Sequence, residues 1–501
     1  MNERKIGILI GYIDIILHTL MNFIYVPILL HYIGKSEYGL YQFIGSFIAY
    51  FSIMDFGLTS AVIRFYTKYK TLKDKISMEN VLAISFRFYT LITIILFILG
   101  YICYLFIDDI FCNSMTASEI ISAKRIFLLL LLNIVVNIST MIFRAVINAH
   151  EKFIFLKSVE MFQLLLQPIL IILVLQEYPY AFSVALVQTV LNIFLNFIRG
   201  FYCFKYLKIR IKYHYWDKKL FKEFKMLALS VFIVTLIDQI FFKTNQLILG
   251  IIDGTNAVAV YAIASLIYMS YMALSSAISG VYLPHITEMV VKKETIEKIS
   301  KLFIQIGRWQ YFLLAAVVSG FILFGKQFIN IWAGVGFEEA YGITLLIIIP
   351  FTINLIQSIG LVILQAQNQY TFRAKIYFLM GFFNLCLSIP LAKIYGGIGC
   401  AFAIGVTMLI GDGLVMNWYY LKITKLEIGR FWKNISRITI GVIIATIIGY
   451  IFNEMIEDKN IIVFIMKLLI YTILYIGIMY KFFMNIEEKS KIKSLVLKFK
   501  R

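Results

Sequence analysis

Residues 126–147 have the sequence IFLLLLLNIVVNISTMIFRAVI, with one charged side chain, Arg144, in 22 positions. At 1.5 Å per residue, a helix of this length is about 33 Å long, which matches the roughly 30 Å hydrocarbon core of a bilayer. The run lacks the period-two alternation of apolar and polar residues that the strands of a membrane barrel have. The stretch therefore predicts a transmembrane helix.

Similar apolar runs recur along the whole chain. The composition agrees, because 61% of the residues are hydrophobic, only 15% are charged and the mean hydropathy is +0.85. We expect an all-α polytopic membrane protein with about 14 transmembrane helices. The other runs cover residues 6–30, 41–63, 81–107, 159–175, 181–204, 226–252, 257–283, 302–324, 340–364, 376–394, 398–421, 438–452 and 461–483.

Lysine and arginine between the runs predict the orientation. If the N-terminus is cytoplasmic, the inner segments hold 36 of these residues and the outer segments hold six. Cytoplasmic loops of membrane proteins carry an excess of lysine and arginine, so both termini are expected in the cytoplasm. The net charge of +19 is then explained by orientation and by contact with anionic lipid rather than with nucleic acid.

The two halves of the chain match weakly at an offset of 220 residues. Residues 34–41 (GKSEYGLY) correspond to 254–261 (GTNAVAVY), His18 to Asp238, and Asn192 to Asp412. An offset of six spans predicts two pseudo-symmetric six-helix lobes of the same orientation plus two C-terminal helices. We expect an N-terminal lobe at residues 1–225, a C-terminal lobe at 226–425, and spans 13 and 14 with a basic tail at 426–501.

Several of these segments resemble a known family. Residues 34–41, MDFGLTSA at 54–61 with Arg64, residues 238–250 with AVAVYAIA at 257–264, and the loop at 325–341 are similar to polysaccharide-biosynthesis (Wzx-type) flippases of the multidrug/oligosaccharidyl-lipid/polysaccharide exporter superfamily. The resemblance covers most of the chain and is weakest over the last two spans. It implies a flippase in the bacterial cytoplasmic membrane that moves polyprenyl-pyrophosphate-linked oligosaccharide to the outer leaflet for surface polysaccharide assembly.

Other functions remain open at this point. A multidrug/cation antiporter of the MATE type and a flippase for a lipid-linked peptidoglycan precursor belong to the same superfamily, and a membrane-embedded transferase is a third possibility. We expect no enzyme and no cofactor, and the scattered cysteines and five histidines predict no metal site. The expected partners are the lipid-linked oligosaccharide, the bilayer and other polysaccharide-assembly membrane proteins.

Ionisable residues inside the runs are the candidate translocation residues, because each costs about 2.5–3.5 kcal/mol to insert. A hydrogen-bonded interior histidine is an equal alternative for His18, and Asp55 could instead pair with Arg64 or cap a bend near Gly57. Arginines near the inner ends either extend to the interface or attract a pyrophosphate. The candidates are Asp14, His18, Asp55, Arg64, Arg144, Asp238, Lys243 and Arg308, with Arg87 and Arg199 in similar inner positions. Lys467 is expected to extend to the outer interface.

Uncharged polar residues recur every fourth position, so they share helix faces. Such stripes can hydrogen-bond neighbouring helices or line a cavity that binds sugar hydroxyls, and the sequence does not separate the two. The main stripe is Gln188, Asn192 and Asn196, and shorter ones are Asn133 with Asn137, Gln163 with Gln167, and Asn354, Gln357 and Gln365.

Overall fold

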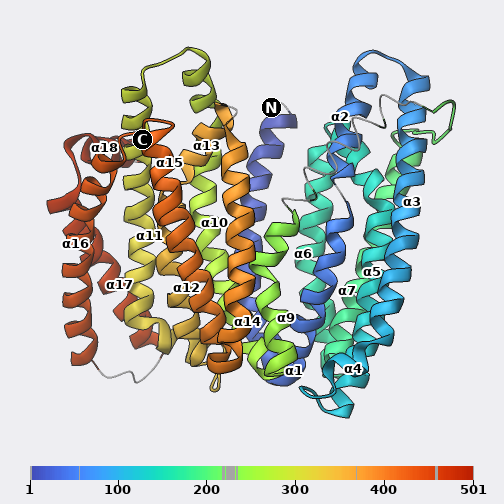
Figure 1. Ribbon diagram of the computed structural model, residues 1–501, viewed down its shortest axis with the longest axis horizontal. Helices are drawn as coiled ribbons and strands as arrows, with labels where there is room; N and C mark the ends of the chain where they lie inside the picture. The colour runs from blue at the N-terminus through green and yellow to red at the C-terminus, as the bar shows by residue number, and fades with distance from the viewer. Residues whose placement is uncertain are drawn as a thin grey trace. The chain divides into compact units, whose positions relative to one another are not determined.

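The computed structural model describes residues 3–55, 57–216, 221, 232, 235–367, 369–456 and 461–499. Every regular element in these ranges is a helix (Figure 1). The chain divides into two compact units, Met1–Ala262 and Ile263–Arg501, with the division inside helix α10. The expected lobes at 1–225, 226–425 and 426–501 stay a prediction.

The first unit is built around the long helix α5, which packs against α1, α2, α3, α6 and α7. Its helices are α1 (Glu3–Phe51), η1 (Ser52–Asp55), α2 (Leu58–Thr71), α3 (Lys75–Leu105), α4 (Ile107–Phe111), α5 (Ala117–Ala149), α6 (Phe153–Leu175), α7 (Ala181–Lys205) and α9 (Thr244–Ile252), followed by the start of α10 (Thr255–Val291).

In the second unit α11 packs against α12, α16 and α17, and α12 packs against α14. The helices after α10 are α11 (Ile296–Trp332), α12 (Glu339–Ile356), α13 (Ser358–Ala366), α14 (Tyr370–Met408), η2 (Leu409–Met416), α15 (Asn417–Lys422), α16 (Ile428–Met455), α17 (Ile461–Ile478), η3 (Met479–Phe483) and α18 (Ile486–Phe499).

Eleven segments of the described chain are long and apolar enough to cross a membrane. Two of them, Leu20–Thr71 and Thr371–Lys422, have 52 residues each, so a straight helix would be about 78 Å long and exceed twice the hydrocarbon thickness. Each is broken at a glycine with positive φ, Gly34 (φ 74°) and Gly396 (φ 53°). The all-α polytopic fold is confirmed. The count of 14 and the cytoplasmic termini remain predictions, and residues 226–231, 233 and 234 of the expected span at 226–252 lie outside the described residues.

Short polar turns start the long helices of the first unit. Asp74 caps α3 by accepting the Ser77 N–H at 3.0 Å, and Thr116 with Glu119 forms a reciprocal capping box at the start of α5. Glu119 also accepts the hydroxyls of Ser36 at 2.7 Å and Thr255 at 2.9 Å. One carboxylate therefore joins the start of α5 to both of the segments that the internal repeat aligns.

The two aligned segments lie in direct contact. A Cβ atom at Gly39 would lie 1.9 Å from the carbonyl oxygen of Thr255 and 3.2 Å from Cβ of Ala259. Only a residue without a side chain permits this approach of α1 to the start of α10. The weak sequence repeat thus marks a close helix contact within the first unit.

Lys467 is buried, whereas Arg87 is exposed and contacts an aromatic ring. Lys467 is 1% exposed, and its Nζ donates to the backbone oxygen of Asn453 at 3.2 Å and to its Oδ1 at 2.9 Å, so the expectation that it extends to the outer interface is wrong. The guanidinium of Arg87 lies 3.9 Å from the ring centroid of Tyr213, in the loop that follows α7. Hydrogen bonds within the protein therefore hold Lys467, and a cation–π contact holds the exposed Arg87, for which both alternatives stay predictions.

Two buried ion pairs hold the second unit together. Arg308 of α11 donates to both carboxylate oxygens of Glu488 at 2.7 and 2.9 Å, and thereby fastens the C-terminal helix α18. Arg373 at the start of α14 pairs with Asp412, which lies in the π-helix η2. Both pairs are almost completely buried, so each charge depends on its partner for compensation.

Candidate functional site

A polar cavity of about 770 Å³ lies inside the first unit, between α1, α5, α6 and α7. Polar side chains line it along most of its length, although it lies among apolar helices. Its charged and titratable lining residues are His18, Arg144, Lys157, Glu160, Arg199 and Lys243. Among these described side chains four cations face one carboxylate, so they give the cavity an excess of positive charge that suits an anion.

The single carboxylate is shared between two of the cations. Glu160 Oε1 accepts Arg144 Nη2 at 2.6 Å, and Glu160 Oε2 accepts Lys157 Nζ at 2.7 Å. The Glu160 side chain is 16% exposed and that of Arg144 is 54% exposed, so the guanidinium stays open to the cavity. The pairing therefore neutralises part of the charge of the cavity without closing it.

Arg199 has the least exposed side chain among the described cations that line this cavity. It is 9% exposed, and its Nη1 donates to Asn196 Oδ1 at 2.9 Å. Its Nε is buried without a hydrogen-bond partner in the described structure. A buried donor that lacks a partner costs free energy, which an anionic ligand oxygen would recover if the Arg199 side chain turned towards it.

A ladder of amide side chains forms one wall. Asn192 donates to Asn133 Oδ1 at 3.1 Å, Asn196 to Asn137 Oδ1 at 2.9 Å, and Gln163 to Asn192 Oδ1 at 2.6 Å. All of these residues except Asn196 also line the cavity. These amides therefore bond α5, α6 and α7 together, and most of them also line the cavity. The stripe of Asn354, Gln357 and Gln365 lies in the second unit, where Gln357 donates to Asn417 Oδ1 at 2.8 Å.

A smaller cavity of about 230 Å³ shares His18, Glu160 and Gln163 with the large one. Gln167 and Asn22 add further amides to its wall. Pro168 also lies there, inside α6, where a proline removes the backbone hydrogen bond of the preceding turn. Glu160 therefore lines both cavities.

Only some of the predicted site residues lie at this cavity. His18, Arg144, Lys243, Gln188 and Asn192 line it, and Asn196 orients Arg199. Lys243 lies at the break that precedes α9. For Asp14 the structure describes only its place in α1, not its side chain.

The other predicted residues lie elsewhere. Asp55 accepts hydrogen bonds from Thr59 at 3.0 Å and Tyr89 at 3.3 Å, beside the break at Gly57, whose φ is +65°. Arg64 is exposed on α2, with its guanidinium 5.6 Å from the ring centroid of Phe65. Asp238 lies in the helical stretch 235–242 and is not among the cavity-lining residues, and Arg308 is paired with Glu488 in the second unit.

Sequence reasoning missed two charged lining residues, Lys157 and Glu160. Glu160 lies at the edge of the run 159–175, and an acid inside a predicted span is a usable signal of a functional site. Among the described residues, no cluster of three histidine, cysteine, aspartate or glutamate side chains could hold a metal ion.

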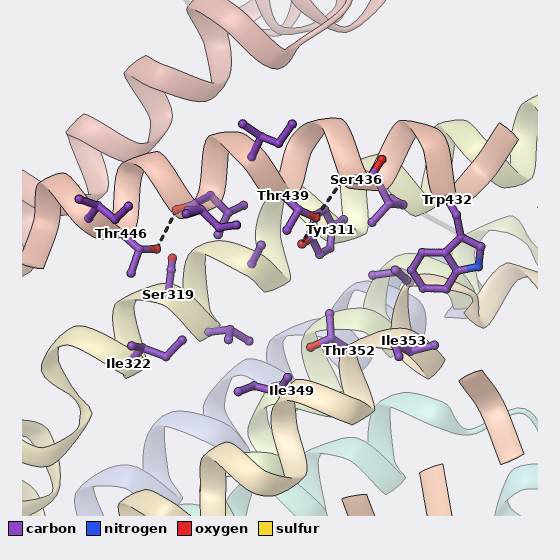
Figure 2. Close-up of a pocket in the computed structure, with 18 residues that line it drawn as sticks. Tyr311, Ser319, Ile322, Ile349, Thr352, Ile353, Trp432, Ser436, Thr439 and Thr446 are labelled. Atoms are coloured by element: carbon purple, nitrogen blue, oxygen red, sulfur yellow. Dashed lines mark hydrogen bonds between the residues drawn. The ribbon is translucent and has the colours of Figure 1, made fainter. Parts of the chain in front are cut away.

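The second unit contains a cavity of a different character, about 600 Å³ in volume, between α11, α12 and α16 (Figure 2). Its walls are mainly isoleucine and valine. The hydroxyls of Tyr311 and Thr439 bond each other at 2.7 Å, and that of Ser319 accepts from Tyr471 at 2.6 Å. With these polar groups satisfied internally, the cavity suits hydrocarbon rather than a charged group.

A family model described as polysaccharide biosynthesis protein matches residues 6–290, which is more than half of the chain. The chain belongs to the polysaccharide biosynthesis protein family. No curated protein matches it.

Solved structures share the fold of this family member. The lipid II flippase MurJ in an inward closed conformation aligns with a TM-score of 0.72 at 18% identity, over 94% of this chain and 97% of that chain. An inward-facing MATE family multidrug resistance transporter of the MOP superfamily aligns at 0.62 with 13% identity, over 84% and 99%. A MOP superfamily transporter from Pyrococcus furiosus, described by a binding pocket of reverse polarity, aligns at 0.54 with 14% identity, over 84% and 95%. The chain is therefore a multi-pass membrane protein with a transporter fold.

Proposed function

We propose that this protein is a flippase that translocates polyprenyl-pyrophosphate-linked oligosaccharide from the inner to the outer leaflet of the bacterial cytoplasmic membrane. Its membership of the polysaccharide biosynthesis family gives the pathway class, and the fold it shares with a lipid II flippase fits a lipid-linked cargo. The observation that carries the proposal is the positively charged polar cavity of the first unit. The surface polysaccharide that receives the cargo is an O-antigen, a capsule or an exopolysaccharide.

The cations of the cavity are the proposed contacts of the pyrophosphate. Arg144 and Arg199 present guanidinium groups, which bind phosphate oxygens through two parallel hydrogen bonds, and Lys157 and Lys243 add charge. The unpartnered Nε of Arg199 is the donor that such a ligand would satisfy. Under the predicted topology Arg144 lies near the cytoplasmic end of its helix, where the cargo would enter.

The amide ladder is the proposed contact of the sugars. Asn133, Asn137, Gln163, Gln188 and Asn192 offer both donors and acceptors to the cavity, which sugar hydroxyls can use in either sense. The cavity volume of about 770 Å³ falls within the 300–1,000 Å³ that is usual for small-ligand sites, so it can accept a headgroup with a few sugars. The polyprenyl chain stays in the bilayer.

The competing function is a MATE-type antiporter for cationic drugs. Such a protein needs acidic groups in its cavity, whereas this cavity has one carboxylate against four cations. We expect the purified protein to bind farnesyl pyrophosphate, with affinity that falls as salt rises, and not to bind the cationic dye ethidium. Isothermal titration calorimetry measures both. Binding of ethidium without binding of farnesyl pyrophosphate would reject the flippase and favour the antiporter.

A further inference from the structure

Among the described side chains that line this cavity, Glu160 is the one acid beside four cations. Its two oxygens make separate contacts, Oε1 with Arg144 at 2.6 Å and Oε2 with Lys157 at 2.7 Å. The two oxygens of a carboxylate, each accepting a hydrogen bond from a different cation, resemble two oxygens of a phosphate group that bind the same two cations. Glu160 therefore makes the contacts with Arg144 and Lys157 that an anionic headgroup would make.

The surroundings of Glu160 differ on its two sides. Towards the large cavity it faces Arg144 of α5 and Lys157 of its own helix, with Arg199 of α7 and Lys243 farther along the wall. The small cavity, which Glu160 also lines, adds Asn22 and Gln167, whose amides offer hydrogen-bond donors. The carboxylate thus has a second polar environment within reach, about 230 Å³ in volume, into which it can turn when another anion takes the cations.

We propose that Glu160 is an internal counter-ion that competes with the pyrophosphate of the substrate for Arg144 and Lys157. This inference rests on the proposed function and assigns the residue that limits affinity at the same site. In the empty cavity Glu160 holds the two cations in place and lowers the local positive charge. When the headgroup enters, Glu160 turns towards the small cavity, and when the headgroup leaves, it returns and speeds release.

The competition has a physical reason. A cavity with four uncompensated cations would bind a pyrophosphate tightly and would release it slowly, because affinity in one site is set mostly by the rate of dissociation. Arg199 is not paired with a carboxylate in the described structure and stays available for first contact. Tight binding is useful to a receptor, whereas a translocator must return to its empty state after each cycle.

The test is the variant Glu160→Gln, studied with farnesyl pyrophosphate as the probe. We expect its affinity for the probe to rise about tenfold, because glutamine keeps the shape of the side chain but no longer neutralises Arg144. The rate of headgroup translocation per molecule should fall in the same variant, because release slows. A residue with a purely structural role would lower the affinity instead. Calorimetry gives the affinity, and proteoliposomes give the translocation rate.

Two further variants make the outcome decisive. Glu160→Asp keeps the charge but reaches less far, so we expect a smaller gain in affinity in a protein that folds like the native one. Glu177→Gln, just beyond the other end of α6 and outside the cavity lining, is the matched control and should leave affinity unchanged. Weaker or unchanged binding in both Glu160 variants would overturn the counter-ion role alone. Failure of the unmodified protein to bind the probe would overturn the proposed function itself.

Discussion

Replacement of Arg199 by glutamine is expected to weaken the binding of farnesyl pyrophosphate by about 100-fold and to abolish detectable flipping. A hundredfold loss of affinity corresponds to about 2.7 kcal/mol. This value lies within the range of about 2–5 kcal/mol that removal of one partner from a buried, charge-assisted contact costs. Arg199 combines burial, a place in the cavity wall and an unpartnered Nε, which no other residue of the described structure combines. Its loss should therefore exceed the effect of removing Arg144, which Glu160 already partly neutralises.

Two controls separate the role of the guanidinium from that of charge. Arg199→Lys keeps the charge but loses the planar pair of donors, so we expect an intermediate loss of affinity. Arg210→Gln changes an exposed arginine of the loop after α7 and should bind the probe normally. If Arg199→Gln bound farnesyl pyrophosphate as well as Arg210→Gln does, Arg199 would have no part in holding the anion.

Replacement of Glu488 by glutamine is expected to lower stability by about 3–5 kcal/mol, because it leaves the buried guanidinium of Arg308 without a counter-charge. Glu488 accepts two hydrogen bonds from Arg308 and one from the backbone N–H of Asn485 at 2.7 Å. The contact fastens α18, so its loss should also make this helix a target for trypsin at its lysines. Thermal unfolding in detergent and limited proteolysis measure the two effects.

The neighbouring residue provides a matched control. Glu487 lies 3.7 Å from Lys301, and both side chains are about two-thirds exposed. An exposed pair of this kind contributes about 0–1 kcal/mol, so Glu487→Gln should unfold and be cleaved like the native protein. Equal behaviour of the two variants would show that the Arg308–Glu488 pair does not hold α18.

Much of the fold could be predicted from hydropathy because the bilayer restricts the chain so strongly. Long apolar runs require helices with internally bonded backbones, and this physical requirement holds regardless of how the helices pack. The breaks could not be predicted in the same way. One break lies at Gln357, between α12 and α13, and another is the π-helix at 409–416. They depend on side-chain contacts, such as the hydrogen bonds from Asn417 to the carbonyls of Asp412 and Gly413.

The site was predictable in its residue types and not in its assembly. A spacing of four showed that Asn192 and Asn196 share a face, but which helices those amides meet depends on packing that a single sequence does not contain. The same limit explains the error with Lys467. Extension to the interface is the ordinary expectation for a lysine near a helix end, and only the contact with Asn453 on another helix shows that its side chain is held inside.

The most direct test of the account is the leaflet distribution of lipid-linked oligosaccharide in a strain that lacks this protein. The pool is extracted and resolved with a membrane-impermeant probe, in cells complemented with the native protein or with Arg199→Gln. The account predicts that complete repeat units accumulate on the cytoplasmic leaflet without the protein and with Arg199→Gln, and that the native protein restores them to the outer leaflet. An unchanged pool in the deletion strain would contradict the flippase function and would make the cation antiporter the better explanation.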